Sequence, residues 1–91
     1  PTARAGAGAV APRVVWQPAT DAMILELRAA DSTGLLYRVA TALDRADAEV
    51  RSARISTLGA DVVDAFYLVG AWDDPARRGL VEEAVVAAVR G

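Results

Sequence analysis

Residues 23–46 read MILELRAADSTGLLYRVATALDRA, and the spacing of their apolar side chains changes partway along. In the first six residues apolar and polar positions alternate, with Met23, Leu25 and Leu27 on one face, which predicts a half-buried strand. Short residues that bond their own backbone follow at 31–34 and predict a tight connection. After them the apolar side chains fall at helical spacing, at Leu36, Val39, Ala40 and Leu43.

Three further segments have the composition of strands. Residues 13–17 are a short β-prone run that a turn at 18–21 closes. Val50–Leu58 alternate again, and a turn at 59–61 leads into the most β-prone stretch of the chain. In that stretch we expect one face to carry Val63, Ala65, Tyr67 and Val69.

A second helix is expected after Asp74-Pro75, because a carboxylate caps free amides and proline suits the first helical turn. The predicted order is strand, strand, helix, strand, strand, helix. This order predicts a two-layer α+β sandwich, with two helices on one face of a four-stranded antiparallel sheet. Residues 1–12 are rich in alanine and glycine and are expected to be a flexible linker or tail, and 13–91 to be the domain.

Composition removes several classes of function. The 91 residues carry a net charge of −2, with no cysteine, histidine or lysine, and all ten cations are arginine. Disulfides, thiolate or imidazole metal sites, Schiff bases and imidazole catalysis are therefore excluded. The acidic balance argues against nucleic acid, and no apolar run reaches the roughly 18 residues of a membrane span. We expect a cytoplasmic, non-catalytic domain that holds no metal or cofactor and contacts neither nucleic acid nor membrane.

Three motifs carry a family resemblance. The stretch ADSTGLL at 30–36 resembles the strand–helix elbow of ACT domains. VRSARISTLG at 50–59 and VVDAFY at 62–67 are similar to the last ACT domain of PII-protein uridylyltransferase/uridylyl-removing enzymes. The resemblance spans roughly residues 13–90. It implies a ferredoxin-like ACT fold in a regulator of nitrogen metabolism.

ACT domains usually have the order βαββαβ, in which the last strand lies beside the first. Here the chain ends after the second helix, so we expect residues 13–17 to take the last strand's place. The strand that begins at Met23 would otherwise be an unpaired sheet edge. The result is a permuted ββαββα order, with the sheet order one, two, four, three.

The resemblance also implies a ligand site. ACT domains bind amino acids, in this family glutamine, at the elbow of one domain and the start of the next strand in a neighbour. On this chain the elbow positions are Asp31, Ser32, Thr33, Gly34 and Leu35, and the strand-start positions are Glu49 and Val50. Amides at a helix N-terminus suit a carboxylate, and a glycine lets a ligand approach the backbone. In the alternative interpretation, Asp31 or Ser32 only caps the helix.

Three residues depart from the family pattern in these turns. Thr33 replaces a proline, and Asp47 and Glu49 replace a glycine and an asparagine. Glu49 repels a ligand carboxylate but can pair with an ammonium group.

The sheet face away from the helices is expected to carry charges that either pair across strands or form a contact surface. These residues are Glu26, Arg28, Arg54 and Asp64. Phe66 is expected on the same face, where it can form a docking patch with Ile24 and Leu68. Arg77 and Arg78 are expected to lie in solvent.

Three functions follow from these observations. The first is a regulatory sensor, in which an amino acid binds between this domain and another ACT domain, in tandem or as a homodimer, and controls the parent catalytic domains. The second is an interaction module that pairs with another ACT domain or docks on a catalytic domain and binds no metabolite. We expect Val50–Leu58 to be the sheet edge that is open to such a partner. The third, a small enzyme, is disfavoured because no serine or threonine has a histidine or lysine to activate it.

Overall fold

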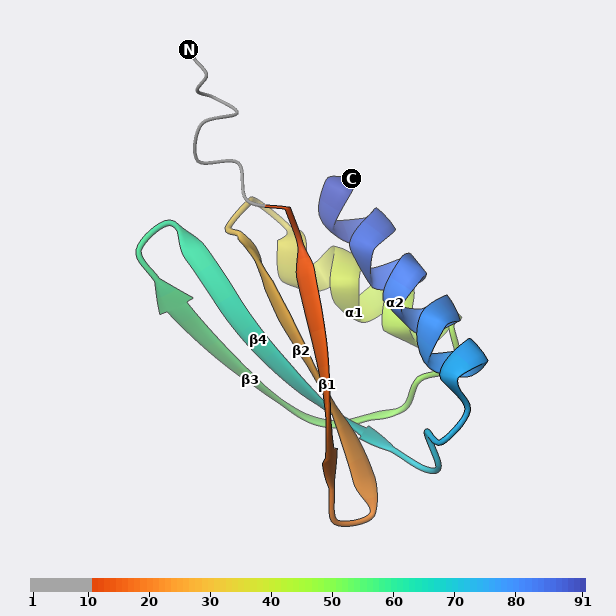
Figure 1. Cartoon of the computed structure of the whole chain (residues 1–91). Helices are drawn as coiled ribbons and strands as arrows, with labels where there is room; N and C mark the ends of the chain where they lie inside the picture. The colour runs from red at the N-terminus through yellow and green to blue at the C-terminus, as the bar shows by residue number, and fades with distance from the viewer. Residues whose placement is uncertain (1–10) are drawn as a thin grey trace.

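The computed structural model describes residues 11–91, so most of the predicted linker lies outside the described residues. The element order is β1 (Arg13–Ala19), β2 (Ala22–Ala30), α1 (Leu35–Arg45), β3 (Val50–Leu58), β4 (Asp61–Val69) and α2 (Pro75–Arg90). Figure 1 shows both helices on the same side of the sheet. The predicted ββαββα sandwich is confirmed. Neither helix in this part of the chain is long and apolar enough to cross a membrane.

The four strands form one antiparallel sheet in the order β1-β2-β4-β3, as predicted. Strand β1 continues through Ala19, two residues beyond the predicted end, because only Thr20 and Asp21 form the turn into β2. Asp21 has φ 56°, and two-residue hairpins need such left-handed positions, which aspartate tolerates better than most residues. Strand β1 thus covers the edge of β2 that would otherwise be unpaired.

The prediction for the two faces of β4 was wrong. Residues directly opposite each other in a ladder share a face, and the ladder places Phe66 opposite Leu25 and Asp64 opposite Leu27. Both β2 residues are fully buried under the helices, so Phe66 and Asp64 belong to the core side. Because β4 is apolar at nearly every position, alternation alone does not distinguish its inner from its outer face. The expected docking patch of Phe66 and Leu68 on the outer face does not exist.

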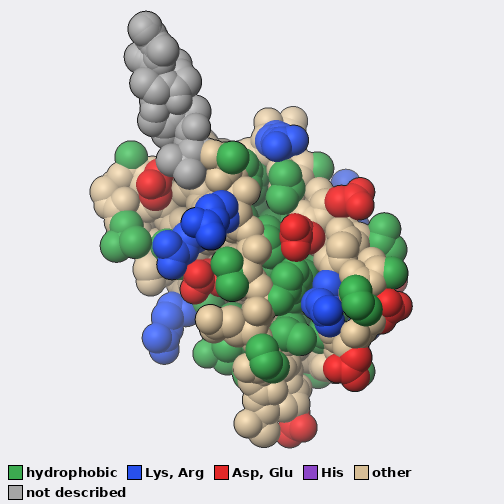
Figure 2. All heavy atoms as spheres, viewed as in Figure 1, with side chains coloured by type: hydrophobic (Ala, Val, Ile, Leu, Met, Phe, Trp, Pro, Cys, Tyr) green, Lys and Arg blue, Asp and Glu red, His purple; other side chains and the backbone are tan. Residues whose placement is uncertain are grey.

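Strand β3 forms the other edge, and all nine of its residues are exposed. The helices do not cover it, so even its helix-facing residue Ile55 is 45% exposed. A bulge between Val50 and Ser52 shifts its register against β4. Figure 2 shows the hydrophobic side chains gathered in a band between the strands on the left and the helices on the right.

The buried face of α1 also differs from the prediction. Leu35, Val39 and Leu43 are buried, at a spacing of four residues, whereas Leu36 is 46% exposed. Residues at i, i+4 and i+8 lie along one slowly turning row of the helix surface, and Leu35 rather than Leu36 belongs to this row. Because the two leucines are adjacent, the sequence does not show which of them faces the sheet. Helix α2 begins as predicted, because Asp74 Oδ1 accepts a hydrogen bond from the Ala76 amide at 2.9 Å.

Of the two arginines expected in solvent at the start of α2, Arg77 is exposed and Arg78 partly buried, and both also make contacts with the protein. The guanidinium of Arg77 lies 3.9 Å from the ring centroid of Trp72, a cation–π contact, and also donates to the Asp47 carbonyl. Arg78 donates to the Trp72 carbonyl. Trp72 packs in turn against Trp16, with ring centroids 6.0 Å apart. These contacts fasten the start of α2 to the loop before β3.

Candidate functional site

The elbow between β2 and α1 is built by backbone contacts. The Asp31 amide donates to the Ala60 carbonyl at 2.9 Å, which ties the end of β2 to the turn before β4. Gly34 then adopts φ 74°, a left-handed conformation that a residue with a Cβ enters only at a cost. Helix α1 begins at the next residue, Leu35, whose amide donates to the Ser32 carbonyl at 3.1 Å. The glycine is therefore needed for the turn itself.

No side chain caps α1. Its N-cap residue is Gly34, without a side-chain hydrogen bond, so the alternative interpretation that Asp31 or Ser32 caps the helix was wrong. The reason is geometric, because the left-handed glycine places both side chains outside the cap position. The first amides of a helix have no partner within the helix and carry the positive end of its dipole. The elbow thus leaves a positive helix end free of an internal carboxylate.

Arg38 holds the elbow in place, and the sequence interpretation did not identify it. Its Nη1 donates to the Thr33 carbonyl at 2.7 Å, its Nη2 to Ser32 Oγ at 3.1 Å, and its Nε to the Ala88 carbonyl at 2.9 Å. One guanidinium therefore joins the elbow to the last turn of α2. The only signal in the sequence is an arginine one helical turn after the elbow glycine, which by itself indicates nothing more than an exposed face.

The strand-start positions Glu49 and Val50 lie at the other end of α1. Eleven helical residues separate them from the elbow, a distance of roughly 16 Å at 1.5 Å per residue. One chain therefore does not bring the two halves of the predicted site together. That the two halves come from neighbouring domains stays a prediction.

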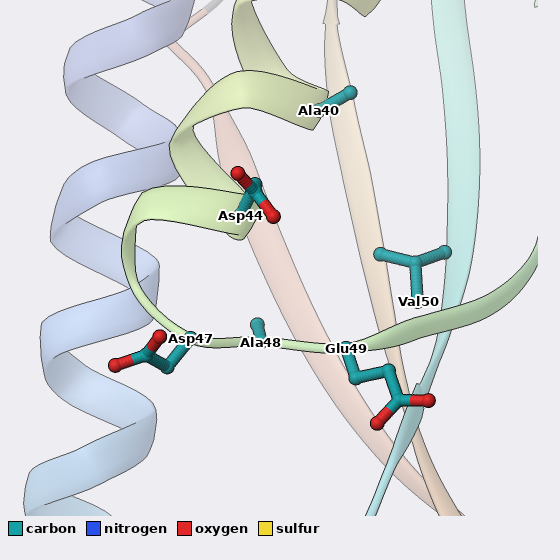
Figure 3. A pocket seen from close by; sticks show the side chains of 6 residues that line it. All are labelled: Ala40, Asp44, Asp47, Ala48, Glu49 and Val50. Atoms are coloured by element: carbon teal, nitrogen blue, oxygen red, sulfur yellow. The ribbon is translucent and has the colours of Figure 1, made fainter.

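Glu49 and Val50 line a hollow of about 560 Å³, together with Ala40, Asp44, Asp47 and Ala48. Figure 3 shows that the Asp47 and Glu49 side chains point away from each other, so the acidic residues do not converge. No group of acidic side chains within residues 11–91 is arranged to hold a metal ion. Asp47 has φ 59°, which explains why the resemblance places a glycine here and why aspartate is accepted.

Asp64 is the one charged residue that is buried within the described part of the chain. It is 2% exposed, and its Oδ1 has no hydrogen-bond partner there. Burial raises the pKa of Asp64 above its ordinary value, and the nearby charge of Asp31 raises it further. The prediction of a solvated, cross-strand-paired Asp64 was therefore wrong.

The described elements define a ferredoxin-like α+β sandwich of the kind that ACT domains adopt. The crystal structure of an unknown protein from Galdieria sulphuraria is similar, with a TM-score of 0.62 and 24% identity. The similarity covers 78% of this chain and 40% of that chain, and it supports the fold alone. No known family profile matches the chain.

Three curated proteins share a stretch of similar sequence with the chain. The chain is 52% identical over 59 residues to the bifunctional uridylyltransferase/uridylyl-removing enzyme of Streptomyces coelicolor, covering 63% of this chain and 7% of the relative. It is 51% identical over 47 residues to the enzyme of the same name from Ralstonia nicotianae, covering 52% of this chain and 6% of the relative. It is 39% identical over 61 residues to the enzyme of the same name from Rhodospirillum rubrum, covering 65% of this chain and 6% of the relative. The chain is thus homologous to a C-terminal segment of these enzymes and spans a small fraction of their length.

Proposed function

We propose that this chain is a regulatory domain that binds an amino acid, glutamine by its resemblance, and controls a uridylyl-transferring and uridylyl-removing enzyme. In this proposal the chain senses the metabolite, and catalytic domains elsewhere in the parent enzyme perform the chemistry. The observation that carries it is the uncapped N-terminus of α1 at Gly34. Arg38 makes that end rigid before any ligand arrives, which lowers the cost of ordering it on binding.

The elbow has the chemistry of an α-carboxylate site. The amides of Ser32, Thr33 and Gly34 donate to no other backbone group within residues 11–91. Together with the positive end of the α1 dipole they can hold a small anion. No acidic side chain occupies that place, because Asp31 does not cap the helix.

The second half of the site comes from a neighbouring domain. Strand β3 is a sheet edge with free backbone groups, and another ACT domain can extend the sheet by pairing with it. In such a pair, Glu49 and Val50 of the neighbour lie against the elbow, and the Glu49 carboxylate meets the ligand's ammonium group. A ligand bound between two domains favours the paired state by its differential affinity, which is how it regulates the parent enzyme.

The exposure of β3 also favours a second candidate function. A strand exposed along its full length, with Ile55 and Leu58 in solvent, has the character of a docking edge. The departures at Thr33 and Glu49 from the family's ligand-contacting pattern point the same way. In this candidate function the domain pairs with another ACT domain or docks on a catalytic domain, and no metabolite takes part.

Calorimetric titration of the 91-residue chain with each of the twenty amino acids distinguishes the two functions. The sensor predicts binding of glutamine, which Glu49→Gln weakens by about 1–3 kcal/mol, the scale of a lost charge-assisted bond. Glu83→Gln, on an exposed part of α2, is the matched control and leaves binding unchanged. If no amino acid binds while sedimentation shows stable self-association, the domain is an interaction module instead.

A further inference from the structure

The outer face of the sheet, which is the face away from both helices in Figure 1, is mostly apolar. Every residue of β4 on this face except Asp61 is valine, alanine or tyrosine, and the neighbouring strands add Val15 and Ile24. An antiparallel strand with one face in water usually alternates apolar and polar residues, whereas a strand covered on both faces is apolar throughout. No element within residues 11–91 covers this face, so its composition indicates a partner from outside.

Two opposite charges lie on either side of the centre of the outer face. Ala65 of β4 is directly opposite Glu26 on β2 and directly opposite Arg54 on β3, so the three residues form one row. Neighbouring strands lie about 4.8 Å apart, which places the backbones of Glu26 and Arg54 roughly 10 Å from each other. The small side chain of Ala65 lies between them. A negative and a positive group therefore flank a centre that no large side chain fills.

Glu26 and Arg54 do not pair with each other. The ion pair found within residues 11–91 joins Arg28 Nε to Glu26 Oε1 at 3.3 Å. Arg54 is exposed and takes no part in that pair. A carboxylate has two oxygens and accepts from more than one donor, so Glu26 can receive a second guanidinium while it keeps Arg28.

This row is complementary to itself. A two-fold axis that runs along β4 through Ala65 exchanges the β2 side of the face with the β3 side. A second copy placed over the face by this rotation sets its Arg54 over Glu26 and its Glu26 over Arg54, while Ala65 meets its own copy. In the next row the rotation sets Ser56 over Arg28, so no like charges of β2 and β3 meet.

We propose that the outer face binds a second copy of this chain, sheet against sheet, around a two-fold axis through Ala65. The inference goes beyond the proposed sensing function, because it assigns a different surface and needs no ligand. Packed sheets lie about 10 Å apart, and the side chains of glutamate and arginine together are long enough to bridge that gap. Aligned sheets cross at about 30°, so Asp61 at the end of β4 diverges from its own copy.

The size of the face predicts weak association. Strands β2, β3 and β4 have nine residues each, so together they form a face of about 14 Å by 30 Å. Such a contact covers roughly 400 Å² on each copy, or about 800 Å² in total, which is less than the roughly 1,000 Å² of a stable interface. We therefore expect a transient dimer that is populated at high micromolar concentration.

Sedimentation equilibrium of the 91-residue chain at increasing concentration measures the dissociation constant of this dimer. Glu26→Arg and Arg54→Glu each bring like charges together twice in the dimer, so each should raise the constant at least tenfold. The double variant Glu26→Arg/Arg54→Glu exchanges the two charges and should restore the wild-type value. Glu83→Arg makes the same change of charge on an exposed part of α2 and is the matched control, which should leave the constant unchanged.

Two of the variants separate this face from the sheet edge. A dimer that Glu26→Arg leaves unchanged overturns the inference, because β2 lies two strands away from the β3 edge through which another pairing would form. A double variant that dimerises as weakly as the single variants also overturns it. So does a wild type that stays monomeric at high micromolar concentration. None of these results bears on amino-acid binding, which calorimetry tests separately.

A second measurement needs no variant. The methyl resonance of Ala65 should shift when the wild type is diluted from high to low micromolar concentration. The methyl resonance of Ala53, on the helix-facing side of β3, is the matched control and should stay in place. An Ala65 resonance that dilution leaves unchanged overturns the inference.

Discussion

Replacement of Arg38 by methionine tests whether one guanidinium holds the elbow to α2. Methionine keeps an unbranched apolar stem and a similar helix propensity, so the substitution chiefly removes three hydrogen bonds. The bond from Nε to the Ala88 carbonyl is partly buried and contributes about 1–1.5 kcal/mol, whereas the two exposed bonds contribute roughly 0.5 kcal/mol each. The free energy of unfolding should therefore fall by about 2 kcal/mol.

Urea unfolding followed by tryptophan fluorescence measures this loss, because Trp16 and Trp72 both pack against the core. For a domain of this size, the loss corresponds to a fall in Tm of roughly 8–16 °C. Arg45→Met in the last turn of α1 is the matched control and should cost less than about 1 kcal/mol, the scale of a helix-dipole contact. Amide exchange at Leu35, whose amide donates to the Ser32 carbonyl in the elbow, should also accelerate in the Arg38 variant alone. Equal destabilisation by the two substitutions would refute the reasoning.

Two further predictions concern stability alone. Burial raises the pKa of Asp64 in the folded chain above its ordinary 3.8, so its ionisation removes stability as the pH rises through the raised pKa. Asp64→Asn should therefore have a higher Tm than the wild type at pH 7, and this difference in Tm should disappear below about pH 3.8. Thermal melts at both pH values test this prediction. An equal Tm at pH 7 would contradict it. Gly34→Ala should lower the free energy of unfolding by about 1–2 kcal/mol, because Gly34 has φ 74°. Gly79→Ala should raise it by about 0.5–1 kcal/mol, because Gly79 lies within α2 and has open space around it. Chemical unfolding of both variants measures the difference, and the same sign for the two would show that backbone conformation at the elbow is not the cause.

The elbow could be located from the sequence, but its contacts could not be described from it. The glycine after three short polar residues marks the elbow, because such a turn needs left-handed backbone, and Gly34 has that conformation. Asp74 was identified as a cap for a similar local reason, and its side chain accepts the Ala76 amide. The role of Arg38 was not predictable, since its partners on α2 lie 50 residues away in the chain. Nor was the absence of a side-chain cap, which depends on one backbone dihedral angle.

The sequence by itself determined the order and type of the elements. Alternation of period two and helical spacing are local properties, and they identified four strands and two helices and predicted the position of β1 in the sheet. Only the tertiary structure decided which face of β4 is inside, because valine, alanine, phenylalanine and leucine fill both faces of that strand. The choice depends on register, since a strand whose faces are both apolar is oriented by its pairing with β2, where Leu25 and Leu27 face the helices. That same pairing buries Asp64, so a charged residue in the core is placed by contacts that no local pattern contains.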